Sequence, residues 1–215
     1  MNSIVTLVQA FGVAYAAGLN LYASVAVIGL AARFGWLGPL PGSLATFANP
    51  WVIAIAAILY VIEFVATLLP GVASAWETVH SLIRPPAAAA LAAATAWNGD
   101  PVLVLLAALL GGGIAAATHT TKLGLRYAID TSPEPFTNAA SNAAELGLVT
   151  GLLLAIWSHP FLAVAIALAI LVFLIATVRL IWRALRQVLS GRWVPGRGFL
   201  QAPRSSGSVH PPDDV

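Results

Sequence analysis

Long runs of apolar residues are the feature that most restricts how this chain folds. They cover roughly 3–35, 50–69, 101–120, 137–157 and 160–182, and a helix needs about 20 mostly apolar residues to cross a membrane. The runs are too continuous for the alternating pattern of a membrane β-barrel. Only 8% of the 215 residues are charged, too few for the surface of a water-soluble fold. The sequence therefore predicts an all-α integral membrane protein with about six or seven transmembrane helices.

The first apolar run is too long to be a single transmembrane helix. As one helix, residues 3–35 would extend about 50 Å, whereas the hydrocarbon core of a bilayer is about 30 Å thick. We expect a break within GLNLY (18–22), because Gly18 relaxes the backbone and Asn20 can bond the backbone groups that a break frees. MNSIVTLVQA has no basic residue, so a cleaved signal peptide is not expected.

Basic residues after the last apolar run predict the orientation. Cytoplasmic flanks of membrane helices are rich in Lys and Arg, so the C-terminus is predicted to be cytoplasmic. Residues 1–194 would form the transmembrane domain, and the Pro-, Gly- and Ser-rich segment 195–215 a disordered cytoplasmic tail. The arginines that carry this prediction are Arg179, Arg183, Arg186, Arg192 and Arg197.

An internal repeat is suggested by one gapless alignment. NPWVIAIAAILYVIEFVAT (49–67) aligns with HPFLAVAIALAILVFLIAT (159–177), each with a proline at the start and Ala-Thr at the end. This predicts two three-helix repeats, 3–69 and 101–183, joined by a linker helix within 70–100, as in transporters built from parallel repeats. Chance similarity among apolar residues is the alternative.

Polar residues inside the apolar runs are the functional signal. A charged side chain at bilayer depth costs a few kcal/mol and so usually faces a partner or a water-filled cavity. Glu63 lies inside the second run, with Tyr60 and Thr67 on the same helical face.

Segment 132–151 carries a second polar face. SPEP, with Glu134, favours a helix start, and Asn138, Asn142 and Glu145 then line one face. GLVTG (147–151) places glycines at 147 and 151, a GxxxG pattern that favours close helix packing.

Segment 73–84 carries a polar stripe that includes Glu77 and Arg84, with His80 beside it. We expect it to lie at the membrane interface with Trp76 as an anchor. The alternative is that it enters the helix bundle and pairs with Glu63, with Pro85-Pro86 separating it from the alanine-rich residues that follow.

A basic face follows on the next helix. His119, Lys122 and Arg126 fall at i, i+3 and i+7. For Lys122 and Arg126 we favour a role as determinants of topology, with a role in a polar pathway as the alternative. The GGG at 111–113 has no GK[ST] after it and is interpreted as a packing or flexibility feature and not as a phosphate loop.

Other classes of function are not expected. The four histidines lack metal-ligand spacing, and no serine or histidine has a recognisable nucleophile setting, so we predict no metal, no cofactor and no enzyme activity. The chain has no cysteine. A basic soluble surface for nucleic acid is absent.

Three segments resemble the multi-pass bacterial membrane proteins of domain-of-unknown-function family 4126. They are GLNLYASVAVIGLAARFG (18–35), the PG…WETVHSLIRP run (70–85) and TK-x-G…TSPEPF-x-N (121–138). The resemblance implies a bacterial inner-membrane location and carries no activity. The residues that match are Asn20, Glu77, His80, Arg84, Lys122, Glu134 and Asn138. The chain departs from the family pattern, where charged residues are expected, at Thr67, Leu68, Ala73 and Leu146.

Two functions remain open from the sequence. The favoured one is a small permease or channel-like transporter for an ion or small polar solute, either proton-coupled through Glu63 or lipid-handling. The alternative is a membrane scaffold or assembly protein whose polar residues only join helices. The expected partners are the bilayer and an unidentified solute or ion, and the oligomeric state stays open. The pathway or polar-core candidates are Asn20, Glu63, Glu77, His80, Arg84, His119, Lys122, Glu134, Asn138, Asn142 and Glu145.

Overall fold

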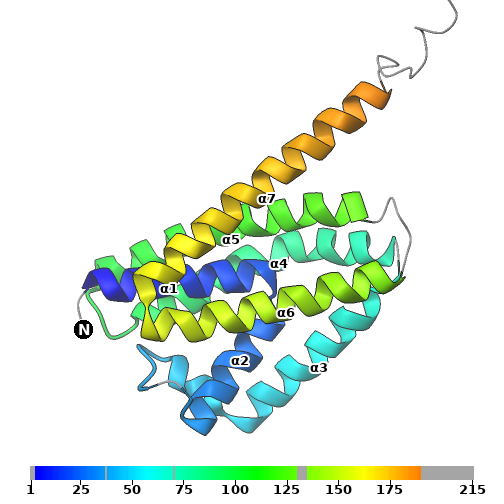
Figure 1. Ribbon diagram of the computed structural model, residues 1–215. Coiled ribbons are helices and arrows are strands. Elements are labelled where there is room, and N and C mark those ends of the chain that lie inside the picture. Colours follow the sequence, from blue (N-terminus) through cyan, green and yellow to red (C-terminus); the bar gives the residue numbers. More distant parts are fainter. Residues whose placement is uncertain (1–2, 37, 70, 130–134, 190–215) are drawn as a thin grey trace, which may run out of the picture. The chain divides into compact units, whose positions relative to one another are not determined.

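The computed structural model describes residues 3–36, 38–69, 71–129 and 135–189. Within these ranges the chain forms seven α-helices and one short 3-10 helix and no β-strand (Figure 1), which confirms the all-α prediction. Glu134 and the predicted tail lie outside the described residues. The elements are α1 (Ser3–Leu19), α2 (Leu21–Phe34), η1 (Leu44–Ala48), α3 (Pro50–Ala66), α4 (Val72–Ala96), α5 (Pro101–Ile129), α6 (Pro135–Ser158) and α7 (Pro160–Leu189).

Among the described residues, three helices are long and apolar enough to cross a membrane, by length and composition. The stretches concerned are Pro101–Tyr127 in α5, Phe136–Ser158 in α6 and Pro160–Thr177 in α7. Helices α1, α2 and α3 are apolar but shorter, and α4 carries the polar stripe. These lengths and compositions suggest a membrane protein.

The first apolar run is broken at Asn20, as predicted. Asn20 has an extended backbone (φ −147°, ψ 107°), and its Oδ1 accepts a hydrogen bond of 2.9 Å from the Ala23 N–H. In a continuous helix that N–H would donate to the carbonyl of Leu19. The break therefore caps α2 and leaves the Leu19 carbonyl available to another donor.

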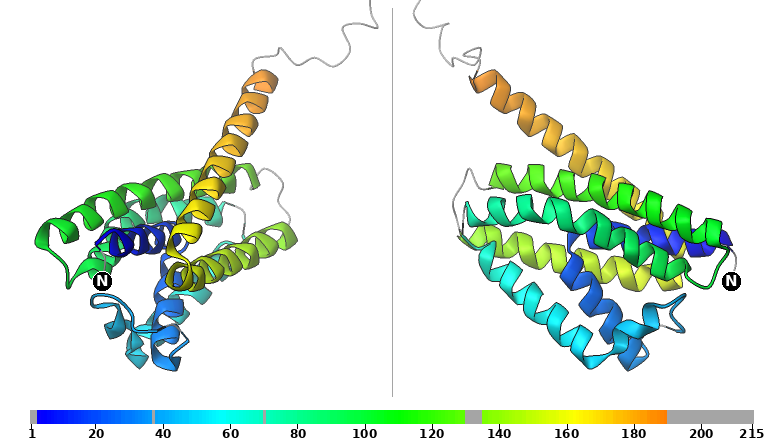
Figure 2. Two further views of the ribbon diagram at one scale, coloured as in Figure 1. Left: turned by 60° about the vertical axis from the view of Figure 1, so that its left-hand side comes forward. Right: turned by 180° about the vertical axis from the view of Figure 1, so that it is seen from behind.

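Helices α1 and α2 form a V whose two open ends lie at the same end of the bundle, here called the N-terminal end (Figures 1 and 2). The start of α1, the loop after α2 and the turn between α4 and α5 line one cavity there, which includes Ser3, Gly42 and Asn98. The Ser43 N–H donates to the Ala94 carbonyl at 2.8 Å. The opposite end holds the α3–α4 connection.

Small residues set the closest helix contacts. A Cβ added to Gly18 of α1 would lie 2.8 Å from the backbone Cα and O of Ala115 in α5, and one added to Gly111 would lie 2.5 Å from the Cβ of Ala92 in α4. Helices α1 and α4 thus approach α5 at distances that only glycine allows, and the predicted packing role of the GGG segment is confirmed at Gly111.

The GxxxG prediction for α6 is wrong. Gly147 and Gly151 are exposed, and no atom lies within 4 Å of a Cβ built on either. Helix α6 instead turns Val149 and Leu153, both fully buried, toward the core. The spacing of the two glycines was right for packing, but the larger apolar side chains occupy the buried face.

Helix α4 enters the bundle, so the expectation of an interfacial helix is wrong. Glu77 and Arg84 are fully buried and His80 is 3% exposed. The alternative, in which this segment enters the bundle, had Pro85 and Pro86 separating it from the alanine-rich residues, but the helix continues through both prolines. These prolines lie where α4 is packed closely against α5, with the Pro85 carbonyl 3.5 Å from a Cβ added to Gly112. This packing supports a helix that lacks two N–H donors.

The chain divides into two compact units, Met1–Val178 and Arg179–Val215. In the second unit, the last turns of α7 carry an Arg186 guanidinium 5.2 Å from the ring centroid of Trp182, a cation–π contact.

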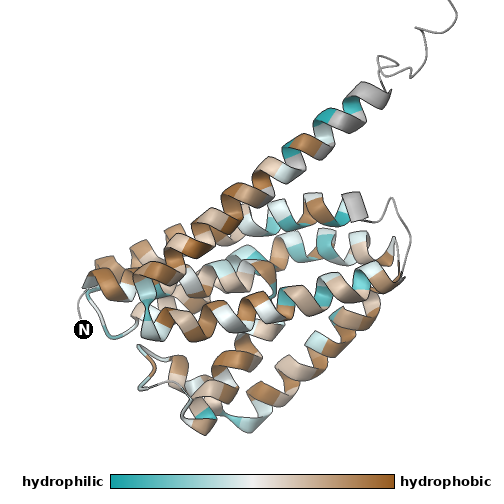
Figure 3. Ribbon diagram, in the orientation of Figure 1, coloured by the Kyte–Doolittle hydropathy of each residue, from teal (hydrophilic) through white to brown (hydrophobic). Residues whose placement is uncertain are grey.

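In the first unit, hydrophilic bands lie on α4, α5 and α6 toward the end opposite the N-terminal end, amid largely hydrophobic helices (Figure 3). These bands contain most of the candidate site.

Candidate functional site

Polar side chains from several helices meet beside the break at Asn20. We call this set the polar core, and six of its seven members are buried, while Glu145 is half-buried. The polar core consists of Asn20 between α1 and α2, Glu63 of α3, Glu77 and Arg84 of α4, His119 and Lys122 of α5, and Glu145 of α6. The structure thus brings together seven of the predicted site residues.

Arg84 lies at the closed side of the polar core. Its guanidinium bridges two carboxylates, with Nη2 2.6 Å from Glu63 Oε1 and Nη1 2.5 Å from Glu77 Oε2, and its side chain is 0% exposed. Nη1 also lies 3.0 Å from His119 Nδ1. Because a guanidinium only donates, His119 Nδ1 accepts. His119 is then a neutral imidazole whose Nε2–H faces the Glu77 carbonyl at 3.1 Å.

His80 lies one turn before Arg84 on α4 and bonds to other groups. Its Nδ1 is 2.8 Å from the Trp76 carbonyl and therefore donates to it, and its Nε2 lies 3.1 Å from the Tyr22 hydroxyl, which can either donate or accept. His80 thus joins α4 to α2, whereas the sequence had placed it beside the polar stripe of Glu77 and Arg84.

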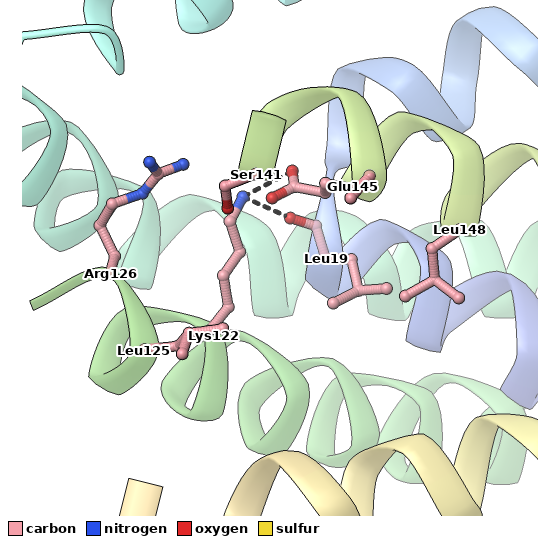
Figure 4. A pocket seen from close by; sticks show the side chains of 8 residues that line it. Leu19, Lys122, Leu125, Arg126, Ser141, Glu145 and Leu148 are labelled. Carbon is pink, nitrogen blue, oxygen red and sulfur yellow. Dashed lines mark hydrogen bonds and ion pairs between the residues drawn. The ribbon is translucent and has the colours of Figure 1, made fainter. Parts of the chain in front are cut away.

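Lys122 lies at the centre of an oxygen cluster (Figure 4). Its Nζ is 2.7 Å from Glu145 Oε1 and 2.7 Å from the Leu19 carbonyl that the break frees. Glu77 Oε1 lies 2.9 Å from the same nitrogen and Glu63 Oε1 3.5 Å from it. Four helices, α1, α3, α4 and α6, therefore direct an oxygen toward one ammonium group of α5.

Asn20 connects the break to two of these carboxylates. Its Nδ2 donates to Glu63 Oε1 at 2.9 Å and to Glu145 Oε1 at 2.8 Å. Its Oδ1 accepts the hydrogen bond from the Ala23 N–H that caps the start of α2. The amide thus uses both N–H groups and its oxygen, and it fixes the tip of the V against α3 and α6.

Arg126 extends the polar core toward the start of α6. It is 3% exposed, and its Nη2 and Nη1 donate to the Oδ1 atoms of Asn142 (2.8 Å) and Asn138 (3.3 Å). Asn142 in turn donates to Thr67 Oγ1 at 2.8 Å. Both predicted asparagines thus lie next to the polar core. For Arg126 a role in setting topology was favoured over a role in a polar pathway, although its position on the face of His119 and Lys122 was a signal for the second.

The two sides of the polar core differ in access. A cavity of about 200 Å³ opens between α5 and α6 beside Lys122 and Glu145 (Figure 4). On the Glu63 side, the side chains around Tyr60 and Thr67 pack too closely to admit a water molecule. The residues that line the open cavity are Leu19, Lys122, Leu125, Arg126, Ser141, Ala144, Glu145 and Leu148.

The charged groups in and beside the polar core are equal in number. Three carboxylates, Glu63, Glu77 and Glu145, lie in the polar core, and three cations, Arg84, Lys122 and Arg126, lie in it or directly beside it, while the contact with Arg84 makes His119 neutral. Buried charges persist only when they are paired and hydrogen-bonded. Within the described part of the chain, the buried Glu63 Oε2 has neither a hydrogen bond nor an ion pair.

In the ranges that the structure describes, no group of three or more His, Asp or Glu side chains is arranged to hold a metal ion. The centre of the oxygen cluster is filled by the Lys122 ammonium. In this conformation the polar core is therefore a closed set of ion pairs with one accessible edge, at Lys122 and Glu145.

Comparison with known proteins gives a family. A family model described as "Domain of unknown function (DUF4126)" matches residues 7–180. The match includes α2, all of α1 except its first four residues, and every residue of the polar core. Neither the comparison with curated proteins nor that with solved structures returned a match.

Proposed function

The chain belongs to the DUF4126 family, whose description assigns no activity, and from the geometry of its polar core we propose that it is a small membrane permease for an ion or small polar solute. The binding site in this proposal is the accessible edge of the polar core, at Lys122 and Glu145. Asn20, Glu63 and Glu77 hold that edge in place, and the cavity between α5 and α6 gives access to it.

One observation carries the proposal: an open cavity ends at buried charges where a helix is broken. In transporters, broken helices direct freed backbone carbonyls and helix ends at ions and substrates near the middle of the membrane. Here the freed Leu19 carbonyl and the Asn20 amide both contact groups beside the cavity, namely Lys122 and Glu145. A charged pair at this depth is costly, and a functional role accounts for its retention.

We also propose a placement in the membrane, which the ends of the helices support. In it, α1 and α2 enter and leave on the outer side and α3 to α7 each cross, so that the arginines of the last turns of α7 and beyond lie on the cytoplasmic side of a bacterial inner membrane. Large exposed aromatic side chains at the N-terminal end support an interfacial belt there. These are Trp36 after α2, Trp51 at the start of α3 and Trp97 at the end of α4.

The direction of the helices also supports the predicted repeat. Helix α1 runs away from the N-terminal end, α2 runs back toward it, and α3 runs away again. In the same way, α5 runs away from the N-terminal end and α6 runs back toward it (Figure 2). In this plan the broken pair of 17 and 14 residues corresponds to the unbroken α5 and α6 of 29 and 24 residues, and α4 is the linker helix.

A scaffold is the second candidate, and the closed side of the polar core favours it. Arg84 is fully enclosed and ion-paired with Glu63 and Glu77, as expected of a cation that only joins helices. The two candidates differ on the open side, because a scaffold has no use for a cavity at Lys122 and Glu145.

Reconstitution into liposomes tests the proposal. Uptake of ²²Na⁺ and ⁸⁶Rb⁺, and proton flux read by a trapped pH dye, would be measured under an imposed potential against empty liposomes. A Ser141→Leu variant fills the cavity without altering a charged group, and an Ala143→Leu variant on an exposed part of α6 is the matched control.

We expect flux of at least one ion in the wild type and in Ala143→Leu, and its loss in Ser141→Leu. Flux that equals the empty-liposome background in every arm, or flux that Ser141→Leu leaves unchanged, would contradict a pathway through this cavity.

A further inference from the structure

The oxygen cluster around Lys122 has the composition of a cation site. We propose that the Lys122 ammonium is a tethered occupant of a monovalent-cation site, and that a free monovalent cation takes its place when Lys122 moves into the adjacent cavity. This inference rests on the proposed function and names the class of ion that it handles.

The ligands come from the chain itself. A carbonyl at the end of a broken helix and carboxylates from neighbouring helices are the groups that coordinate small hard cations in proteins. Leu19 O, Glu145 Oε1 and Glu77 Oε1 lie 2.7 to 2.9 Å from the Lys122 Nζ, and Glu63 Oε1 lies 3.5 Å from it. The ammonium group thus marks a point at which oxygens from four helices converge.

A second observation points to a ligand at the same place. Glu63 is 3% exposed, yet its Oε2 has no hydrogen-bond partner among the residues described. A buried carboxylate oxygen without a partner costs free energy. A cation at the centre of the cluster would be free to move toward this oxygen, whereas the ammonium is restrained by its side chain.

The charge balance decides the valence. With Lys122 in place, three carboxylates face three cations, so its ammonium contributes one positive charge to a neutral set. Replacing it by one monovalent cation preserves neutrality, whereas a divalent ion would leave an uncompensated buried charge. The groups that face the site are Glu63 and Tyr60 of α3, Glu77 and Arg84 of α4, His119 and Arg126 of α5, Glu145 of α6, and Asn20.

Lys122 has room to leave. It lines the cavity of about 200 Å³ whose other walls include Leu125, Ser141 and Leu148. A lysine side chain has four flexible carbons and a compact charge, so its ammonium can reach this cavity while the backbone of α5 stays in place. Arg84, whose side chain is fully enclosed, cannot make the same movement.

The sequence supplies a direct probe, because Lys122 is the only lysine in the chain. In the wild-type protein in lipid nanodiscs, a small water-soluble acylating reagent would modify this side chain and the N-terminus, and peptide mass spectrometry would give the rate at Lys122. The rate would be measured in N-methylglucamine, Na⁺, K⁺ and Ca²⁺ at constant ionic strength and at two pH values.

We expect Na⁺ or K⁺ to raise the acylation rate about fivefold or more in a saturable way, because the fraction of released Lys122 grows with cation occupancy. A rise on lowering the pH alone, with no metal ion effective, would identify the cation as a proton. A measurable rate that no monovalent cation and no pH change alters would overturn the inference but leave the pathway intact. A rate of zero in all conditions, with normal acylation after unfolding, would instead contradict the proposed function.

A variant gives an independent readout. Lys122→Met removes the tethered charge, so the cation should now bind without competition. Its midpoint of thermal unfolding, read by tryptophan fluorescence, should rise by about 5 °C or more between N-methylglucamine and saturating Na⁺ or K⁺, well beyond the wild-type response. The double variant Lys122→Met/Glu145→Gln should lose most of this rise. A folded Lys122→Met protein whose midpoint ignores every monovalent cation would contradict the inference, and the acylation assay decides the matter if this variant does not fold.

Discussion

Arg84 and Lys122 bridge the same two carboxylates, Glu63 and Glu77, yet their surroundings differ. Arg84 is fully enclosed, with each contacting nitrogen directed at a fixed acceptor. Lys122 is 7% exposed and borders an open cavity. Arginine suits the first position because its planar guanidinium fits two carboxylates at once. Lysine suits the second because its charge can move. The comparison separates a structural cation from a functional one within a single polar core.

The largest effect is expected at the structural cation. Arg84→Met should lower the free energy of unfolding by about 3–5 kcal/mol, because it leaves Glu63 and Glu77 buried without their shared partner. Lys122→Met, measured in saturating Na⁺, should lower the free energy of unfolding clearly less than Arg84→Met does, because a free cation can replace the ammonium. Chemical unfolding in detergent micelles, followed by tryptophan fluorescence, measures both. Equal losses for the two variants would remove the distinction between the two cations.

A smaller effect is expected at the tip of the V. Asn20→Ala removes a helix cap and two hydrogen bonds to carboxylates, for an expected loss of about 2–4 kcal/mol. Asn49→Ala is the matched control, because exposed Asn49 caps α3 by accepting from the Trp51 N–H at 2.9 Å, and it should cost only about 0.5–2 kcal/mol. If the two alanine variants are equally stable, the links from Asn20 to Glu63 and Glu145 contribute nothing.

The smallest of the three effects concerns the packing that brings Lys122 to Leu19. Gly18→Val would place atoms against the Ala115 backbone and push α1 from α5, at a cost of about 1–3 kcal/mol. Gly147→Val, at an exposed glycine of α6, should change stability by less than about 0.5 kcal/mol apart from the helix preference of valine. Thermal unfolding of both variants makes the comparison. A harmless Gly18→Val would mean that α1 and α5 are not held at the distance described.

The sequence predicted the features that depend on local chemistry. The break near Asn20 followed from a run too long for one helix, with an amide able to bond freed backbone groups. The polar residues of the core were found because charges in apolar runs are costly and need partners. Of the eleven candidates, seven meet in the polar core, two asparagines lie beside it, His80 bonds to Tyr22 and the Trp76 carbonyl instead, and Glu134 lies outside the described residues.

Features that depend on which helix faces which were not predictable in the same way. The periodicity of α4 defines a polar stripe but not whether the stripe faces the membrane surface or other helices, so the interfacial alternative was favoured wrongly. The glycines at 147 and 151 have packing spacing, yet larger side chains of α6 fill its buried face. Arg126 was assigned to topology because its partners, Asn138 and Asn142, come from another helix.

Water access to the edge of the polar core is the most direct test of the account. The chain has no cysteine, so single cysteines would be placed at Ser141 in the cavity, at fully buried Ser24 beside the break, and at exposed Ala143 of α6. A small charged methanethiosulfonate would then be applied to the protein in sealed vesicles. The account predicts that Ser141→Cys is labelled while Ser24→Cys and Ala143→Cys are not. Ser141→Cys that stays as unreactive as Ala143→Cys, although both react after unfolding, would contradict it.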